Sequence, residues 1–261
     1  MPESPEHRKD PDCVIEVSNL RKVYTGKRRV EAVKGISFSV KRGEIFTIVG
    51  PNGAGKTTTL ECIEGLRKPT SGSIKIFGLE IWRSTHREEV REVKRKLGVQ
   101  LQDARFPLRL KVSEVVKTFL TIYGEDEKKC MEVLEKVELT QKAGFLVKNL
   151  SGGQYQRLRL AVAIGHDPEI VFLDEPTTGL DPHARRAIWE IVKNLKKEGK
   201  TVVLTTHYME EAQNLSDTVA IMNRGKIVAL DSPSRIISSS VGEGTLEDAY
   251  LALTGEKFRE A

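Results

Sequence analysis

The fold of this chain follows from one segment, Ile45-Phe46-Thr47-Ile48-Val49-Gly50-Pro51-Asn52-Gly53-Ala54-Gly55-Lys56-Thr57-Thr58. Its first five residues are mostly apolar and β-branched, which is typical of a buried strand. A glycine-rich loop follows, and a helix is predicted over residues 57–66. Residues 50–57 consist of a glycine, four further residues and then Gly-Lys-Thr, which is the P-loop pattern. In a P-loop, backbone N–H groups and the amino end of a helix surround phosphate oxygens. The segment therefore predicts a phosphate-binding strand–loop–helix unit.

Two side chains of the same loop are expected to contact a nucleotide and Mg²⁺. We expect Lys56 to reach the β- and γ-phosphates and Thr57 to coordinate Mg²⁺, so ATP and Mg²⁺ are the predicted cofactors. A plain glycine-rich turn is the alternative, which the preceding strand and following helix disfavour. The predicted nucleotide-binding residues here are Gly50, Pro51, Asn52, Gly53, Ala54, Gly55, Lys56, Thr57 and Thr58.

A second apolar strand ends in two acids, in the run Glu169-Ile170-Val171-Phe172-Leu173-Asp174-Glu175. This is a Walker B pattern. We expect Asp174 to organise Mg²⁺ and Glu175 to activate the attacking water as general base. Taken alone, two acids at a strand end could also be solvated surface charges. Beside a P-loop, the catalytic interpretation is favoured.

The predicted strands and helices divide the chain into two kinds of region. Short β-branched runs alternate with helices before residue 103 and after residue 165, whereas helical periodicity alone fills the interval. Such alternation indicates a mostly parallel sheet covered on both faces. We predict an α/β P-loop NTPase core with an inserted all-helical subdomain; the antiparallel β patch that we also expect near the N-terminus is implied by the family resemblance described below. The predicted boundaries are 1–12 for a flexible leader, 13–102 and 166–261 for the core lobe, and 103–165 for the helical lobe.

Composition limits the functional classes. The chain has 261 residues, 39% hydrophobic and 30% charged, with a formal net charge of +5. This balance is typical of a globular protein. The sequence has no apolar stretch of about 18–20 residues, the length that a helix needs to span a membrane. The N-terminal residues lack the apolar core of a secretory signal. Three scattered cysteines, Cys13, Cys62 and Cys130, form no disulfide framework or zinc motif and fit a reducing compartment.

A third motif is Leu150-Ser151-Gly152-Gly153-Gln154. It resembles the signature of ABC (ATP-binding cassette) ATPases, and the resemblance extends from about residue 14 to residue 255. Because the motif directly precedes a predicted helix, its N–H groups and the Ser151 hydroxyl can face a γ-phosphate. The resemblance implies a single ABC ATPase domain over residues 13–261, with the signature on the helical lobe.

Further roles come from the resemblance alone. Tyr24 lies where the family has an aromatic that stacks on adenine, and His207 where it has the switch histidine that binds the γ-phosphate. Asp181 belongs to a segment similar to the D-loop. Gln102 resembles the Q-loop glutamine that touches Mg²⁺ and the lytic water, although Gln100 is a competing candidate because the usual preceding proline is missing. The implied catalytic set is Glu175, His207, Gln102 and Lys56, and the implied Mg²⁺ ligands are Thr57, Gln102 and Asp174.

In this family the P-loop of one chain faces the signature of another across a head-to-tail dimer. The resemblance therefore implies a homodimer or heterodimer of ATPase subunits that ATP closes, and a separate transmembrane permease as partner. Residues 105–108, Arg-Phe-Pro-Leu, are candidates for holding a cytoplasmic helix of that permease, a packed loop being the alternative.

Three segments, 206–212, 217–222 and 225–229, and the closing residues 246–250 and 253–255 look like those of the multidrug and ABC-2 exporter group. We thus expect an ATP-hydrolysing exporter subunit, peripheral on the cytoplasmic face of the membrane, with no stable nucleic-acid partner. The alternatives are an importer subunit, a soluble ABC ATPase acting on ribosomes or nucleic acid, and a non-catalytic nucleotide sensor, which intact Glu175 and His207 disfavour.

Overall fold

The structure is a computed structural model that describes residues 12–26, 29–82, 84–100 and 105–255. The predicted leader, apart from Asp12, lies outside the described residues, and so does Gln102. The boundaries proposed for the two lobes stay a prediction.

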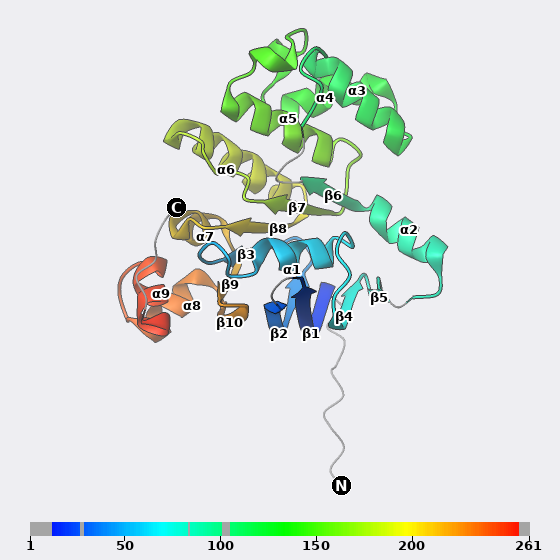
Figure 1. The fold of residues 1–261 in the computed structure, drawn as a ribbon. Helices are drawn as coiled ribbons and strands as arrows, with labels where there is room; N and C mark the ends of the chain where they lie inside the picture. Colours follow the sequence, from blue (N-terminus) through cyan, green and yellow to red (C-terminus); the bar gives the residue numbers. More distant parts are fainter. Residues whose placement is uncertain (1–11, 27–28, 83, 101–104, 256–261) are drawn as a thin grey trace.

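A six-stranded sheet forms the centre of the molecule, with strand order β10-β9-β3-β8-β7-β6 (Figure 1). The strands from β9 to β6 run parallel to one another, and only β10 is antiparallel to its neighbour. Their bounds are β3 Ile45–Val49, β6 Leu97–Gln100, β7 Ile170–Asp174, β8 Thr201–Thr206, β9 Thr218–Asn223 and β10 Lys226–Asp231. All residues of β3, β7 and β8 are buried, as expected for strands covered on both faces.

An antiparallel sheet of order β2-β1-β4-β5 lies at the opposite end from the helical subdomain (Figure 1). Its strands are β1 Cys13–Thr25, β2 Arg29–Lys41, β4 Ser71–Ile76 and β5 Leu79–Glu80. The first two are longer than their apolar runs predict, because their outer halves pair through partly exposed residues.

Helices cover both faces of the central sheet. Alternation along β7 shows how: Ile170 and Phe172 pack in one core with α1 and the antiparallel sheet, whereas Val171 and Leu173 pack with the helical subdomain and α6. The helices outside the helical subdomain are α1 Lys56–Ile63, α2 Arg87–Arg95, α6 Pro182–Lys197, α7 Met209–Leu215, α8 Pro233–Ser240 and α9 Leu246–Thr254.

From residue 105 onward, where the structure describes it, the predicted helical insertion contains three α-helices and three short 3₁₀ turns. The helices are α3 Val112–Tyr123, α4 Cys130–Lys136 and α5 Gly152–Ile164, and the turns are Glu127–Lys129, Thr140–Lys142 and Val147–Asn149. They share one buried core, and Figure 1 shows them gathered at one end of the molecule beside β6 and α6. The fold class predicted from the sequence is confirmed.

Serine is a weak helix former, so the serine run 238–240 on its own predicts a loop. This prediction is wrong, because the run ends helix α8. Ser232 and Pro233 start this helix at positions that suit them, and Ile236 anchors it in the core. The Ser238 and Ser239 hydroxyls donate to the carbonyls of Arg235 and Ile236, so the serines are compatible with the helical turn.

Within the described residues, none of the helices combines the length and the apolar character that crossing a membrane requires.

Candidate active site

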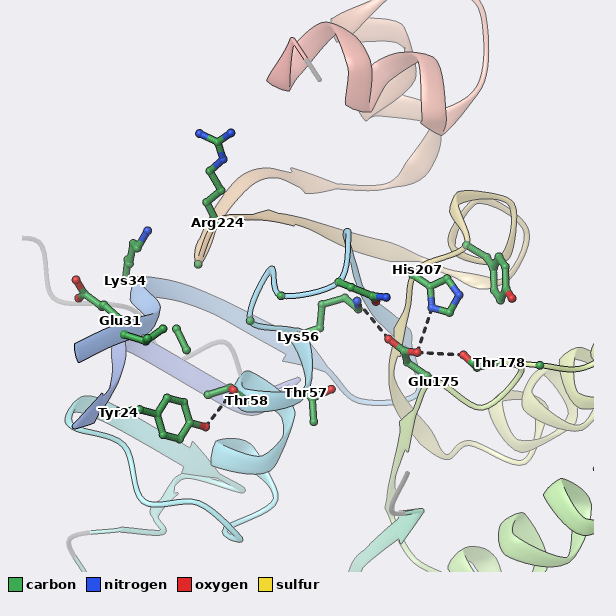
Figure 2. Close-up of a pocket in the computed structure, with 18 residues that line it drawn as sticks. Tyr24, Glu31, Lys34, Lys56, Thr57, Thr58, Glu175, Thr178, His207 and Arg224 are labelled. Atoms are coloured by element: carbon green, nitrogen blue, oxygen red, sulfur yellow. Dashed lines mark hydrogen bonds and ion pairs between the residues drawn. The ribbon is translucent and has the colours of Figure 1, made fainter. Parts of the chain in front are cut away.

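A cavity of about 1040 Å³ opens beside the carboxyl ends of β3, β7 and β8 (Figure 2). It gathers residues far apart in the sequence, from the first strand to the β9–β10 hairpin. Its lining comprises Tyr24, Val30, Glu31, Ala32, Lys34, Asn52, Gly53, Gly55, Lys56, Thr57, Thr58, Glu175, Thr178, Gly179, His207, Tyr208, Arg224 and Gly225.

Glycines shape the loop between β3 and α1. Gly55 caps α1 in the left-handed region at φ 104°, and a Cβ there would lie 2.4 Å from the Ala32 carbonyl oxygen. A Cβ on Gly50 would lie 2.2 Å from the Met222 carbonyl oxygen. Only glycine fits both positions without a backbone shift. The loop is thus held between the β-hairpins at the amino end of α1, where backbone N–H groups attract anions.

Lys56 is buried at the centre of this loop. Its ammonium donates to the carbonyl oxygens of Gly50 at 2.9 Å and Pro51 at 3.3 Å, and lies 3.3 Å from Glu175 Oε1. Burial lowers the pKa of Lys56, and the Glu175 carboxylate opposes this effect. The ammonium is therefore poorly solvated and has a strong electrostatic demand for an anionic partner.

Glu175 connects the P-loop to the end of β8. Its Oε2 lies 3.0 Å from His207 Nδ1 and accepts a 3.0 Å hydrogen bond from the Thr178 hydroxyl. Burial raises the pKa of Glu175, but Lys56, His207 and Thr178 together outweigh it and hold the pKa below its ordinary value. The carboxylate is therefore ionised at neutral pH, the state that a general base requires.

Asp174 lies one residue earlier, at the end of β7. Its Oδ1 accepts hydrogen bonds from Thr57 Oγ1 at 3.2 Å and from Thr205 Oγ1. Burial raises the pKa of Asp174, and the two hydroxyls counter it only in part. Thr57 and Asp174 offer adjacent hard oxygen donors, one of them anionic, which is the donor chemistry that Mg²⁺ uses when phosphates and water complete its shell.

Thr205 is a functional residue that motif analysis missed. Its hydroxyl also accepts from the Glu175 N–H at 3.0 Å, so one side chain orients both acids. The signal was available in the strand register, because β7 and β8 pair in parallel with Asp174 opposite Thr205. The sequence shows two apolar strands that both end in polar residues. Pairing these strands in parallel would have identified Thr205 as a neighbour of Asp174.

Glu211, on α7, was also missed. It is fully buried, and its Oε1 accepts hydrogen bonds from Thr177 Oγ1 and Trp189 Nε1, both at 2.9 Å. These bonds tie the segment after Glu175 to α6 and to the helix after His207. Glu211 therefore supports the site from behind.

Tyr24 lies at the outer side of the cavity, where its hydroxyl is 3.2 Å from Thr58 Oγ1 (Figure 2). The Arg67 guanidinium lies 5.4 Å from the centre of its ring. Glu31, Lys34 and Arg224, which the sequence analysis did not single out, also line the cavity here. Arg224 lies on the tight β9–β10 turn, where it and Gly225 both have positive φ, as a two-residue hairpin turn requires.

Residues 33–178, more than half of the chain, match the family model for ABC transporters. The chain belongs to the ABC transporter family. It is 37% identical over 252 residues to the linearmycin resistance ATP-binding protein LnrL of Bacillus subtilis, a match that covers 95% of this chain and 77% of the relative. It is 40% identical over 238 residues to the Nod factor export ATP-binding protein I of Ralstonia nicotianae, covering 90% of this chain and 72% of the relative.

Solved ABC cassettes have the same fold. A dimeric ATP-binding cassette in a post-hydrolysis state with ADP and Pi matches with a TM-score of 0.74 and 29% identity, over 84% of this chain and 98% of that one. An ATP-binding subunit of an ABC transporter matches with a TM-score of 0.78 and 26% identity, over 92% and 99%. The chain is thus an ATPase, the ATP-binding subunit of a transporter.

The signature of this ABC cassette lies at the start of α5, and its five residues do not line the cavity. Ser151 caps the helix: its hydroxyl accepts from the Gln154 N–H, and the Gln154 side chain accepts from the Ser151 N–H at 3.1 Å. Asp181 likewise caps α6 through the N–H groups of His183 and Ala184. Within one chain, the structure therefore does not bring the signature to the P-loop.

The cassette's two candidate Q-loop glutamines have different outcomes. Gln102 lies outside the described residues. Gln100 ends β6 and is buried, and it lines a second cavity rather than the one that holds Lys56 and Glu175. Phe106, from the segment proposed to hold a permease helix, lines that second cavity too, whereas Arg105, Pro107 and Leu108 are exposed.

Proposed function

We propose that this chain is the ATP-hydrolysing subunit of an ABC exporter and that it works as a dimer closed by ATP. One observation carries the chemical part of the proposal. The Glu175 carboxylate, held below its ordinary pKa, lies 3.3 Å from Lys56 Nζ and 3.0 Å from His207 Nδ1 inside the P-loop cavity. This is the arrangement that in-line attack of water on a γ-phosphate needs.

Lys56 and the amino end of α1 bind the phosphates. Phosphate oxygens satisfy the electrostatic demand of the buried ammonium, and they compete with Glu175 and the loop carbonyls for it. Thr57 and Asp174 would hold Mg²⁺, with Gln102 as a further candidate ligand, and the ion would supply positive charge against the phosphates. Tyr24 contacts the adenine at the outer side of the cavity.

Glu175 accepts a proton from the attacking water, and Thr178 and His207 orient its carboxylate. His207 lines the cavity from the end of β8, where it can also donate to the γ-phosphate. Lys56 and His207 then oppose the negative charge that grows in the transition state.

The signature residues Leu150, Ser151, Gly152, Gly153 and Gln154 act in trans. They lie outside the cavity of their own chain, at the amino end of a helix with a favourable field for phosphate. A two-fold head-to-tail dimer, a homodimer or a heterodimer with a homologous subunit, would place them over the partner's γ-phosphate and bring Asp181 to the interface. A similar solved cassette is dimeric, which supports this assembly.

The direction of transport is inferred from the relatives, which include a Nod factor export protein and a linearmycin resistance protein. Export requires a separate transmembrane permease, so we place the chain peripherally on the cytoplasmic face of the membrane. The surface beside Phe106, with exposed Leu108, is the proposed permease contact.

The ATPase cycle is tested with Glu175→Gln and Lys56→Ala. Glu175→Gln removes the base but keeps the ATP contacts, so we expect turnover to fall by at least about a hundredfold. The variant should form an ATP-dependent dimer on size exclusion. Lys56→Ala should lose ATP binding and remain monomeric. A Glu175→Gln protein that stays monomeric with Mg-ATP at high concentration contradicts the dimer, and normal turnover in Lys56→Ala contradicts the P-loop assignment.

The transport role is tested by pull-down of the tagged chain from native membranes in mild detergent. We expect a multi-span protein to co-purify, and its identity would indicate the substrate. Recovery of ribosomes or nucleic acid instead would favour the soluble ABC ATPase and reject the transporter role.

A further inference from the structure

Arg185 lies in the first turns of α6 and is not among the residues that line the nucleotide cavity. Its backbone N–H donates to the carbonyl oxygen of Asp181 at 2.9 Å, so it belongs to the turn that Asp181 starts. Its side-chain Nε is buried and has no hydrogen-bond partner among the described residues. Buried donors without partners are rare, so the position of this guanidinium depends on contacts of another kind.

The contact that holds the Arg185 guanidinium is an aromatic ring. Its Cζ lies 4.0 Å from the centre of the Tyr208 ring. This distance is well within the roughly 6 Å over which a cation is attracted to the face of an aromatic side chain. Both residues are only partly exposed, so water weakens the attraction less than it would at an open surface. Arg185 therefore restrains the Tyr208 ring.

Tyr208 in turn contacts His207, the histidine of the nucleotide cavity. The centres of their rings are 4.2 Å apart, and their planes are inclined by 41°. The Tyr208 N–H donates to Thr206 Oγ1 at 3.0 Å, which fixes the backbone on both sides of His207. His207 Nδ1 lies 3.0 Å from Glu175 Oε2 (Figure 2). The orientation of the imidazole is thus set by two contacts, the Tyr208 ring and the Glu175 carboxylate.

The same face of α6 makes a second contact with the segment after His207. Trp189 follows Arg185 by four residues and lies on the same side of the helix. Its Nε1 donates at 2.9 Å to the buried carboxylate of Glu211, on α7. Burial raises the pKa of Glu211, and the Arg185 charge is among the effects that oppose this rise. Helix α6 therefore supports this segment at two points, Tyr208 and Glu211.

We propose that Arg185 is a positioning residue for ATP hydrolysis. Its guanidinium holds the Tyr208 ring, and the ring holds the His207 imidazole in the orientation that meets Glu175. Removal of the cation leaves the nucleotide contacts in place but lets the imidazole turn, so turnover falls while nucleotide binding stays. This inference rests on the proposed function, in which His207 orients Glu175 and donates to the γ-phosphate. It adds the part of the chain that keeps His207 in place.

The test compares wild type with Arg185→Gln, Arg185→Lys and the matched control Arg186→Gln, which changes the exposed neighbouring arginine. Binding of a fluorescent ATP analogue gives the Kd and the number of nucleotide sites, and kcat is expressed per site so that a misfolded fraction does not lower it. We expect Arg185→Gln to lower kcat about tenfold, with the Kd unchanged within about twofold.

The two other variants separate charge from general disturbance. Arg185→Lys should have a kcat about threefold above that of Arg185→Gln, because an ammonium is also attracted to the ring, although less well than a stacked guanidinium. Arg186→Gln should match wild type. Equal kcat values for Arg185→Gln and Arg185→Lys would show that the cation has no part in positioning, and would overturn the proposal.

Substitutions of Tyr208 test the route from Arg185 to His207. Tyr208→Phe keeps the ring and Tyr208→Leu removes it, so the kcat of the phenylalanine variant should be about fivefold the higher. Adding Arg185→Gln to Tyr208→Leu should lower kcat no further, because both changes remove the same contact. Losses that multiply in the double variant would contradict this route. Should Arg185→Gln fail to fold, the Tyr208 pair still decides, since equal kcat values for its two members would also overturn the proposal.

His207→Ala separates this inference from the proposed function. Wild-type turnover in His207→Ala would overturn the role proposed for His207, and this inference with it. An inactive His207→Ala protein together with a wild-type kcat in Arg185→Gln would overturn only this inference.

Discussion

Glu175 occupies a backbone conformation that non-glycine residues seldom adopt, with φ at 46°. Its N–H, shared between the hydroxyl and the carbonyl of Thr205, holds this geometry at the end of β7. The turn directs the carboxylate toward Lys56 and His207 rather than along the strand. A locally strained residue is thus maintained where the chemistry needs its orientation.

Glu64 makes stability depend on pH. Its pKa is about 8 in the folded chain against 4.5 ordinarily, so between these values the folded chain keeps a proton that the unfolded chain releases. The free energy of unfolding therefore falls as pH rises through this window, by up to roughly 1.4 kcal/mol per unit of pKa shift. Glu64→Gln removes the titrating group, so this fall in the free energy of unfolding should not occur in the variant. We expect its melting temperature to match that of wild type near about pH 5 and to exceed it by several degrees near about pH 9.

The control for this prediction is Glu92→Gln, whose carboxylate is exposed and paired with Arg95. Its melting curve should follow that of wild type at every pH. Parallel pH profiles for Glu64→Gln and wild type, measured without nucleotide, would show that Glu64 is already ionised in the folded chain at neutral pH.

For single residues, the sequence predicted those whose chemical role follows from a motif. Lys56, Glu175 and His207 were all named from spacing or resemblance, and the structure brings them together. Thr205 and Glu64 were not, because their roles depend on which strand and which lobe lie opposite them. Side-chain identity gives no sign of that, since threonine is ordinary in a strand and glutamate is ordinary at a helix end.

Among the elements, the pairing of β7 with β8 positions the acids. Parallel register sets Asp174 opposite Thr205, whose hydroxyl bonds to Asp174 and to the Glu175 N–H. Both strands are wholly buried, so a one-residue slip would exchange the side chains that pack in the two cores on either side of the sheet. The core therefore fixes the geometry of the site.

Thr205→Val tests this arrangement. Valine keeps the shape of threonine but removes the hydroxyl, leaving Asp174 with Thr57 as its remaining hydroxyl partner. We expect a loss of about 1–3 kcal/mol in stability, since buried polar groups lose a partner. Turnover should fall about tenfold, and the Mg²⁺ concentration for half-maximal activity should rise. Unchanged Mg²⁺ dependence would mean that Thr205 serves only the fold.

Element prediction succeeded where burial dictates the pattern. The apolar runs of β3, β7 and β8 could be assigned to their residues because strands covered on both faces must be apolar throughout. It failed where pairing, not burial, determines the element. The outer halves of β1 and β2 are partly exposed, and the serine end of α8 is held by Ile236 and a proline start.

For the whole molecule, the decisive fact is the separation of two functional ends. The P-loop cavity is lined by core residues, and the signature stands at the start of α5 on the helical subdomain. The sequence could place each motif on its lobe, but it could not show that the two stay apart within one chain. This separation is why we propose that the complete site forms between two chains.

Complementation between two inactive variants tests that proposal. Lys56→Ala removes the phosphate contact of its own chain, and Gly152→Asp places a negative charge at the signature. A Cβ on Gly152 meets nothing closer than Leu180 Cδ2 at 4.0 Å, and an acid in the first turn of α5 suits the helix dipole, so the variant should fold. Facing a γ-phosphate, that charge should abolish closure.

Each variant alone should be inactive, because every site of its homodimer carries one defect. In an equal mixture, half of the dimers are mixed, and one site of each mixed dimer combines an intact Lys56 with an intact signature. We expect the mixture to recover about a quarter of wild-type turnover if the two sites act independently.

Mixing Lys56→Ala with Glu175→Gln is the control, because both residues line the same cavity and each composite site keeps a defect. Recovery in the first mixture only means that the signature acts across the interface. No recovery in either means that it acts within its own chain or that the two sites fire only together, and a cross-link-trapped mixed dimer assayed for a single turnover separates these two cases.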